Sequence, residues 1–122
     1  VENEILAFHQ ENLKFICGEY LDILNQKNML PIKSVRTGEW VGKDGVIDIV
    51  MQNEEWDNLL CFCSWKKDVF SYEDYRQCLK VANAARLSPD YVSVFAAGEF
   101  DEELIAEAEH SETLQLVDIN TL

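Results

Sequence analysis

One aspartate in this chain of 122 residues occupies a position that needs a chemical explanation. Asp48 lies inside the apolar run Val46–Val50, whose β-branched residues predict a strand. Aspartate has a poor strand propensity, and a lone charge among apolar neighbours is costly unless a partner satisfies it. Asp48 is therefore either held by backbone donors and a nearby lysine, or it is a metal-binding or catalytic carboxylate.

Metal-dependent cleavage of a phosphodiester would need more groups than Asp48. Mg²⁺ prefers several oxygen ligands, and a nearby lysine would help to polarise the attacking water or the phosphate. These partners should come from the next apolar run, residues 59–65, where alternate side chains point to opposite faces. One face carries Phe62 and Ser64, and the other carries Cys61, Cys63 and Trp65. Neither face supplies a carboxylate or an amine.

The cysteines and histidines offer no stronger site. Cys61 and Cys63 lie two residues apart on one strand face, but a structural zinc site needs four ligands at a characteristic spacing. The other candidates lack that spacing; they are Cys17, Cys78, His9 and His110. We therefore expect reduced thiols that pack as small hydrophobic residues in a cytoplasmic protein, with no metal and no cofactor.

The elements that would position Asp48 are predicted in the order α-β-β-β-α-β-α-β. Near-continuous apolar runs in the first three strands predict strands covered on both faces. We therefore expect residues 1–122 to form a single α/β domain with a mixed central sheet flanked by helices. The first expected elements are a helix from Glu2 to about Asn28 and strands at Lys33–Val41, Val46–Val50 and Leu59–Trp65. The second helix is expected to begin at the capping box Ser71–Asp74 and to end after Leu87, where Ser88-Pro89 stops it. The last expected elements are a strand at Tyr91–Ala96, a helix from Asp101 to about His110 and an edge strand at Leu114–Ile119.

The formal net charge of −13 is concentrated near the C-terminus. Residues 87–122 hold nine acids and no base, whereas the segment Lys33–Lys67 holds six acids and five bases. The acidic balance disfavours binding to nucleic acid or to an anionic membrane surface, although the strand region alone does not exclude a polyanion. The sequence shows no apolar run near the roughly 20 residues of a membrane span. It also shows no glycine-rich phosphate loop that would bind ATP.

A resemblance to a known family begins at the strand that carries Asp48. Residues 38–50, Gly-Glu-Trp-Val-Gly-Lys-Asp-Gly-Val-Ile-Asp-Ile-Val, resemble the Gly-Arg-Trp-Trp…Glu-Ile-Asp-Ile-Val run of a domain of unknown function at the C-terminus of archaeal- and bacterial-type AAA+ ATPases. The family's Gly-Glu-Cys-Lys-Trp signature falls on residues 61–65, its Phe-Ser…Gly-Phe-Thr-Glu-Glu-Leu run on residues 95–104, and its Phe-Glu pair on Phe15-Ile16. That domain is similar to the PD-(D/E)XK nucleases. The resemblance therefore implies a restriction-endonuclease-like fold at the C-terminus of a longer prokaryotic ATPase.

The resemblance also implies five polar active-site positions, and this chain departs from four of them. The aspartate of the second strand is kept as Asp48. The positions where the family pattern implies carboxylates and a lysine are instead Ile16, Val46, Phe62 and Ser64. We therefore expect that the domain is not an enzyme and that Asp48 is vestigial. It would be a nuclease-like interaction or regulatory domain, while any ATPase activity would belong to the longer protein.

The expected partner is the ATPase module in cis or another protein, and two surfaces are candidates for the contact. Trp56 lies in a polar turn where we expect it to be exposed. Asp101, Glu102 and Glu103 open the acidic third helix.

Two alternatives remain open from the residues. One is a divergent metal-dependent DNA nuclease that retains Asp48, and the other is a non-catalytic nucleic-acid-binding module. The nuclease would recruit its lysine and second carboxylate from Lys66, Lys67, Lys80, Glu19 or Glu39. Cleavage that depends on Asp48 would favour the nuclease, and a salt-dependent gel shift would favour the binding module.

Overall fold

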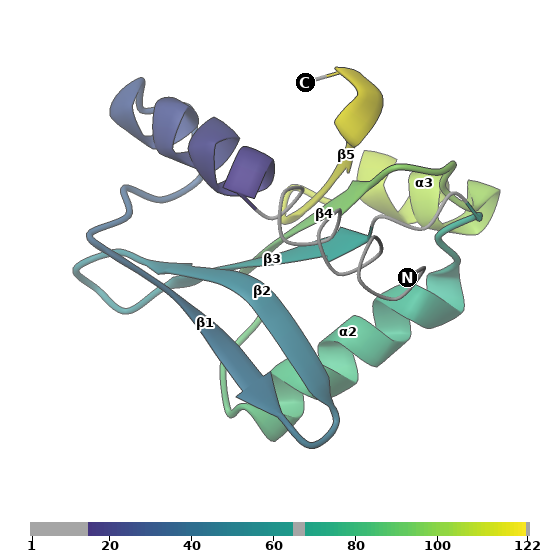
Figure 1. Ribbon diagram of the computed structural model, residues 1–122, viewed down its shortest axis with the longest axis horizontal. Coiled ribbons are helices and arrows are strands. Elements are labelled where there is room, and N and C mark those ends of the chain that lie inside the picture. The colour runs from purple at the N-terminus through teal and green to yellow at the C-terminus, as the bar shows by residue number, and fades with distance from the viewer. Residues whose placement is uncertain (1–14, 65–67, 122) are drawn as a thin grey trace, which may run out of the picture.

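The structure, a computed structural model, describes residues 15–64 and 68–121. Its element order confirms the predicted mixed α/β class (Figure 1). Residues 1–14, where the first helix was expected to begin, and Trp65 lie outside the described residues. The elements are a helix at 15–26, β1 (Arg36–Gly42), β2 (Gly45–Gln52), β3 (Asn58–Ser64), α2 (Tyr72–Ala84), β4 (Tyr91–Ala96), α3 (Glu102–Glu109), β5 (Leu114–Asp118) and the short 3-10 helix η1 (Ile119–Thr121).

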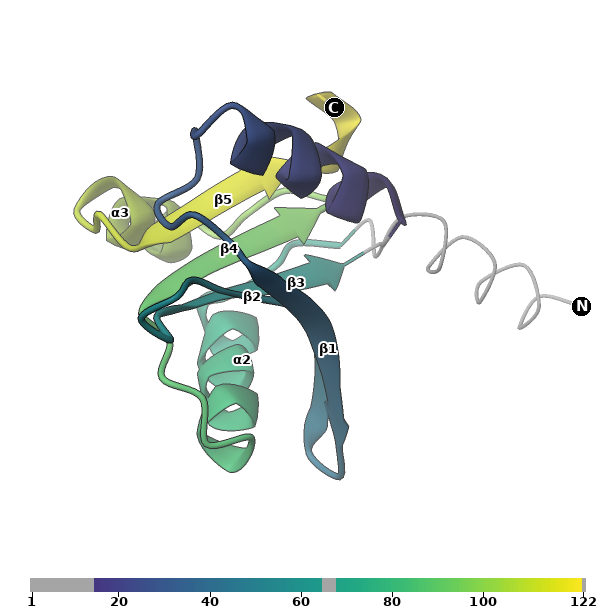
Figure 2. The same ribbon diagram turned by 90° about the vertical axis from the view of Figure 1, so that its left-hand side faces the viewer.

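The five strands form one mixed sheet in the order β1-β2-β3-β4-β5. The pairs β1–β2 and β2–β3 are antiparallel, whereas β3–β4 and β4–β5 are parallel. The parallel pairs require crossover connections, and α2 and α3 provide them. The helix at 15–26 covers one face of the sheet and α2 the other (Figure 2).

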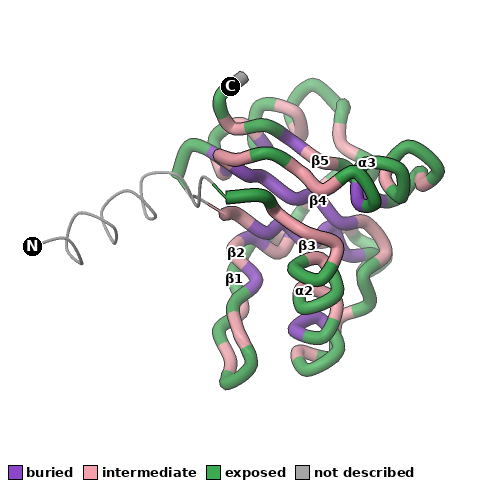
Figure 3. Tube along the Cα trace, turned by 90° about the vertical axis from the view of Figure 1, so that its right-hand side faces the viewer, coloured by how far each residue is buried: buried purple, intermediate pink, exposed green. Residues whose placement is uncertain are grey.

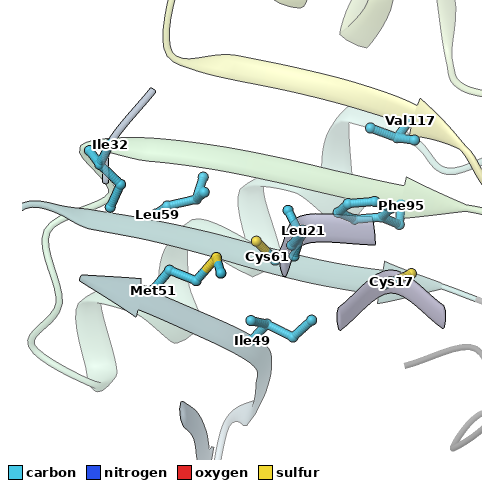
Figure 4. Close-up of a cluster of buried hydrophobic side chains, with 9 residues drawn as sticks. All are labelled: Cys17, Leu21, Ile32, Ile49, Met51, Leu59, Cys61, Phe95 and Val117. Atoms are coloured by element: carbon cyan, nitrogen blue, oxygen red, sulfur yellow. The ribbon is translucent and has the colours of Figure 1, made fainter. Parts of the chain in front are cut away.

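Two clusters of buried side chains hold the three layers together. Beneath the first helix, Cys17 and Leu21 pack on residues of β2, β3 and β4, including Met51, Leu59 and Phe95 (Figure 4). On the opposite face, residues of α2 and α3 such as Val81 and Leu104 pack on Ile47, Leu60 and Val94. Both faces of the central strands are therefore removed from water, which is the main stabilising term for such a sheet.

Burial falls from the centre of the sheet toward β1 (Figure 3). The first five residues of β3 are buried, as a strand covered on both faces requires. The same expectation is wrong for β1, where none of the residues is buried. Because β1 is an edge strand that pairs only with β2, its apolar residue Val41 remains 68% exposed.

The ends of α2 show one confirmed and one corrected prediction. Ser71 and Asp74 form the predicted capping box, with each side chain accepting from the backbone N–H of the other residue. The helix ends at Ala84, before the predicted Leu87. Arg86 adopts a left-handed φ of 58°, and the N–H of Leu87 returns to the carbonyl of Ala82. This local turn, rather than the following proline, terminates the helix.

The later elements follow the prediction closely. β4 spans the predicted residues, α3 begins after the N-cap Asp101 and ends before His110, and β5 is an edge strand. Within the described part of the chain, no helix has the length and apolar character needed to cross a membrane.

Candidate functional site

Asp48 lies at a β-bulge in the middle of β2. Gly38 pairs with Val50 and Trp40 pairs with Ile47, so Glu39 alone stands opposite both Asp48 and Ile49. A bulge of this kind changes the direction in which the following side chains point. As a result, Ile47 and Ile49 enter clusters on opposite faces of the sheet, whereas regular alternation would place them on one face.

The carboxylate of Asp48 is held by the backbone of β3. The residue pairs between β2 and β3 run from Gln52–Asn58 to Ile49–Cys61. Asp48 is the next residue of β2 beyond the last of these pairs. There Oδ2 of Asp48 accepts a hydrogen bond of 2.8 Å from the N–H of Cys63. The half-buried side chain thus supplies an acceptor where the register ends. This contact supports the structural interpretation of Asp48, in which backbone donors satisfy the carboxylate.

A pocket of about 400 Å³ opens on one side of Asp48, and we call it the Asp48 pocket. It lies between the end of the β1–β2 hairpin, the end of β3, the segment 68–70 and α2. Val46, Phe62 and Ser64 line it together with Asp48. The structure therefore brings together four of the five positions that the resemblance implied. The fifth, Ile16, is 39% exposed on the first helix and does not line this pocket.

One face of α2 forms a wall of the Asp48 pocket. Asp74, Gln77, Cys78 and Val81 line the pocket, and their spacing of three or four residues places them on one side of the helix. Lys80 is exposed, outside this spacing, and does not line the pocket. The structure therefore does not bring Lys80 to Asp48 as the nuclease alternative would require. Lys66 and Lys67 lie outside the described residues.

Three further aspartates line the Asp48 pocket, and sequence reasoning missed their convergence. Asp44 comes from the hairpin turn, Asp68 follows β3 and Asp74 belongs to the first turn of α2. No single motif contains them, because they come from segments separated along the sequence. Among the described lining residues, four are aspartates and none is basic.

A second pocket of about 370 Å³ lies on the other side of Asp48, between the first helix and the bulge. Asp22, Glu39 and Asp48 line it, together with the apolar residues Ile49 and Met51. The structure thus places Glu39 beside Asp48, as the nuclease alternative proposed, whereas Glu19 is exposed and lines neither pocket.

The carboxylates of the two pockets do not converge on a single point. Among residues 15–64 and 68–121, no group of three or more histidine, cysteine, aspartate or glutamate side chains is arranged to hold a metal ion. The described residues therefore do not fit the divalent ion that the nuclease fold family would imply, because Mg²⁺ needs close to ideal octahedral geometry.

Comparison with known families gives one match. Residues 1–84 match the family model DUF234, described as archaeal and bacterial proteins of unknown function. This match covers more than half of the 122 residues. The chain belongs to the DUF234 family. Neither the curated proteins nor the solved structures contain a match.

The family match includes most of the residues described above. In this DUF234 chain, the matched segment contains the bulge at Asp48, all of β3 and all of α2. The match therefore covers every described lining residue of the Asp48 pocket, because each of them precedes Ala84. The acidic helix α3 lies beyond the matched segment.

Three of the four thiols of the DUF234 chain have a raised pKa, which favours their protonated form. Burial raises the pKa of the Cys61 thiol. The pKa of Cys63 is raised mainly by a hydrogen bond with Cys17, and burial acts in the same direction. Burial raises the pKa of Cys78 to about 12, and the charges of Asp74 and Asp48 act in the same direction. These three thiols are therefore poor nucleophiles and poor metal ligands near neutral pH.

Trp56, the first candidate contact residue, is 62% exposed as predicted. It has a left-handed φ of 67°, and the guanidinium carbon of Arg36 lies 3.6 Å from the centroid of its ring. Nη2 of Arg36 also donates to the carbonyl of Asn53 at 2.6 Å. Trp56 is therefore an exposed aromatic residue that is held in place by a cation–π contact.

The acidic residues of α3 divide into a structural one and two exposed ones. Asp101 is half-buried, and its carboxylate accepts from the N–H of Glu103 at 3.2 Å and from the N–H of Tyr72 at 3.3 Å. It thereby joins the start of α3 to the start of α2. Glu102 and Glu103 are exposed. None of these residues lines either pocket beside Asp48.

Proposed function

We propose that this DUF234 chain is a catalytically inactive, nuclease-like domain that serves interaction or regulation alongside an AAA+ ATPase module. The composition of the Asp48 pocket carries this proposal. At the positions that the resemblance assigns to catalysis, the pocket has the apolar residues Val46 and Phe62 and the hydroxyl of Ser64. Phe62 is also only 6% exposed and belongs to the core cluster beneath α2.

The charge of the pocket gives independent support. A nuclease must bring a phosphate to its catalytic groups, and proteins do this with lysine, arginine or bound cations. The described lining of the Asp48 pocket instead presents four aspartates and no base. One oxygen of Asp48 already accepts from the backbone of β3. The four aspartates would repel a phosphodiester unless a cation were bound beside them first.

Calorimetry and a cleavage assay test the inactivity. The 122-residue chain and its Asp48→Asn variant would be titrated with Mg²⁺ and with Mn²⁺, then incubated with supercoiled plasmid and each metal. We expect no saturable binding and no difference in cleavage between the two proteins. Cleavage by the natural sequence that disappears in Asp48→Asn would overturn the proposal.

A divergent nuclease is the second candidate, because the second pocket places carboxylates beside Asp48, although among the described residues they are not arranged to hold a metal ion. Glu39 and Asp22 share that pocket with Asp48, so three carboxylates border one depression. This candidate predicts Mn²⁺ binding that weakens at least tenfold in both Asp48→Asn and Glu39→Gln, because each change removes a ligand. Glu19→Gln is the matched control, since Glu19 is an exposed carboxylate of the same helix as Asp22 but lines neither pocket.

The association with an ATPase has its own test. The full coding sequence that contains these residues would be read for a P-loop upstream of Val1, because that motif binds the nucleotide phosphates. A P-loop there would support the proposal, and its absence would remove the ATPase from it.

A further inference from the structure

We propose that Cys17 and Cys63 form a reversible disulfide when the protein meets hydrogen peroxide, and that this bond fixes the first helix to the end of β3. The inference goes beyond the proposed function, because it requires neither catalysis nor a partner. The structure holds the protein in its reduced form, with all four cysteines free. The two residues lie far apart in the sequence, and the fold places their thiols in contact.

Three of the four thiols gather beneath the first helix. Cys17 and Cys61 belong to the buried cluster between this helix and the sheet (Figure 4), and Cys63 packs against the same cluster. The thiol of Cys63 donates a hydrogen bond to the sulfur of Cys17. Thiols joined by a hydrogen bond are neighbours, which is the first requirement for a disulfide.

The geometry of β3 favours Cys17 over Cys61 as the partner of Cys63. Cys61 and Cys63 lie two residues apart on one strand, so their Cα atoms are about 6.6–6.8 Å apart, at the upper limit for a disulfide. Their side chains leave the same face of the sheet side by side, whereas Cys17 approaches from the helix that covers this face. Cys78 packs against the cluster on the opposite face.

The hydrogen bond also prepares Cys17 for oxidation. It lowers the pKa of Cys17, although burial and the charge of Asp48 act in the opposite direction. Peroxide reacts with thiolates, and a cysteine of lowered pKa beside a second thiol is typical of a redox-sensitive pair. Cys63 is partly exposed, whereas Cys17 has no exposed surface. We therefore expect slow oxidation, limited by local openings between the helix and the sheet.

The reaction takes two steps and forms two molecules of water. The Cys17 thiolate attacks one oxygen of hydrogen peroxide, the O–O bond breaks, and the released hydroxide takes up the proton that Cys17 has lost. Cys17 is then a sulfenic acid. The sulfur of Cys63 attacks the sulfur of Cys17, the S–O bond breaks, and the leaving hydroxide takes up the proton of Cys63. The two thiols together lose two electrons and two protons, and peroxide is reduced to water.

The first step also makes the second one easier. The hydrogen bond to Cys17 is the largest cause of the raised pKa of Cys63, and the charge of Cys17 adds to it. Both effects belong to the Cys17 thiolate, which the first step consumes. The thiol of Cys63 therefore loses its proton more readily once Cys17 is oxidised.

Mass spectrometry of the oxidised natural sequence tests the pairing. The 122-residue chain is reduced, freed of reductant and incubated with increasing hydrogen peroxide, and the remaining thiols are blocked with iodoacetamide. Trypsin and chymotrypsin then cut the chain, and cleavage after Phe62 separates Cys61 from Cys63. We expect two of the four thiols to be lost, with one disulfide between Cys17 and Cys63 that dithiothreitol reverses.

Two variants and an unfolded sample show whether the native geometry decides the pairing. Cys17→Ala should lose the disulfide, whereas Cys78→Ala should keep its yield within twofold, because Cys78 lies on the opposite face of the sheet. In concentrated urea the natural sequence should give a mixture of pairs, because the contact of Cys17 with Cys63 is then absent. The pairing in the natural sequence needs no variant, so a poorly folding Cys17→Ala would not obscure it.

Thermal unfolding tests what the bond does to the fold. A disulfide between the first helix and β3 closes a long loop and restricts the unfolded chain. Circular dichroism should show a Tm about 5 °C or more higher in the oxidised natural sequence. Dithiothreitol should reverse this rise, and Cys17→Ala treated with the same peroxide should not show it.

Four results would overturn the inference. Peroxide that leaves all four thiols free would show that the pair is not reactive. A disulfide between another pair, or between two chains, would show that the contact does not direct the reaction. Equal mixtures of pairs in the native and the unfolded protein would exclude a role for the fold. An unchanged Tm in protein that carries the bond would show that it does not fix the helix.

Discussion

At the scale of single residues, Asp48 illustrates how a strand accommodates a charge. The aspartate does not lie in a regular strand, because the bulge opposite Glu39 redirects it. Its carboxylate then accepts the N–H of Cys63 where the register of β2 and β3 ends. Asp48, whose residue type has a poor strand propensity, therefore accepts from the backbone N–H of Cys63, which lies beyond the last residue pair of β2 and β3.

Replacement of Asp48 tests that structural role. Asp48→Ala leaves the N–H of Cys63 without this acceptor and should lower the free energy of unfolding by about 1–3 kcal/mol. Asp48→Asn keeps an oxygen acceptor and should cost less. Urea denaturation measures both, with the exposed Asp44→Ala as control, expected within about 0.5 kcal/mol of the natural sequence. Equal losses in the Ala and Asn variants would contradict the role of the hydrogen bond.

Cys78 makes stability depend on pH in the alkaline range. The folded protein raises the pKa of Cys78 from 9.0 to about 12, so the unfolded chain loses this proton first as the pH rises. The contribution of Cys78 is therefore fully present below pH 9 and declines as the pH rises toward 12. Urea midpoints at pH 7, 9, 10 and 11 should fall less steeply in Cys78→Ala than in the natural sequence. Parallel curves would show that Cys78 does not contribute.

At the scale of elements, the β1–β2 hairpin depends on a close contact between neighbouring residues. The ring of Trp40 occupies the space that a Cβ on Gly42 would need. Trp40 also packs against the cluster beneath α2, so its ring cannot move away without losing that contact. The hairpin and α2 together form the walls of the Asp48 pocket, which makes the packing of Trp40 relevant to the site.

Two glycine substitutions in β1 test the hairpin contact. Gly42→Ala should lower the free energy of unfolding by about 1–3 kcal/mol and change the tryptophan fluorescence, because the ring must shift. Gly38→Ala is the matched control in the same strand, since nothing lies within 4 Å of its added Cβ. Urea denaturation followed by fluorescence measures both changes. Similar effects from both substitutions would point to strand propensity instead of the contact with Trp40.

At the scale of the whole molecule, charge decides which partners can approach. The net charge is −13, and residues 87–122 contribute −9 of it without a single base. The described lining of the Asp48 pocket is acidic as well, although the segment Lys33–Lys67 is nearly neutral in sequence. Among the described residues, the fold therefore brings together four aspartates that are dispersed along the sequence.

This charge distribution predicts weak binding to DNA. A gel-shift titration with a short duplex at low salt, without divalent metal, should show no complex, because few lysines and arginines are available to neutralise phosphates. The same titration with a basic DNA-binding protein shows that the assay works. A shift that appears at low salt and disappears steeply with added salt would instead support the nucleic-acid-binding alternative.

The sequence by itself determined the order of the elements, the bounds of β4, the capping box of α2 and the exposure of Trp56. Each of these follows from local periodicity or from side chains within a few residues. It also identified Asp48 as unusual. Only the tertiary structure decided what surrounds Asp48, because the bulge needs the register of β1, and the aspartates of the pocket come from three separate segments. Contacts between distant segments depend on packing, which periodicity along one strand or helix does not contain.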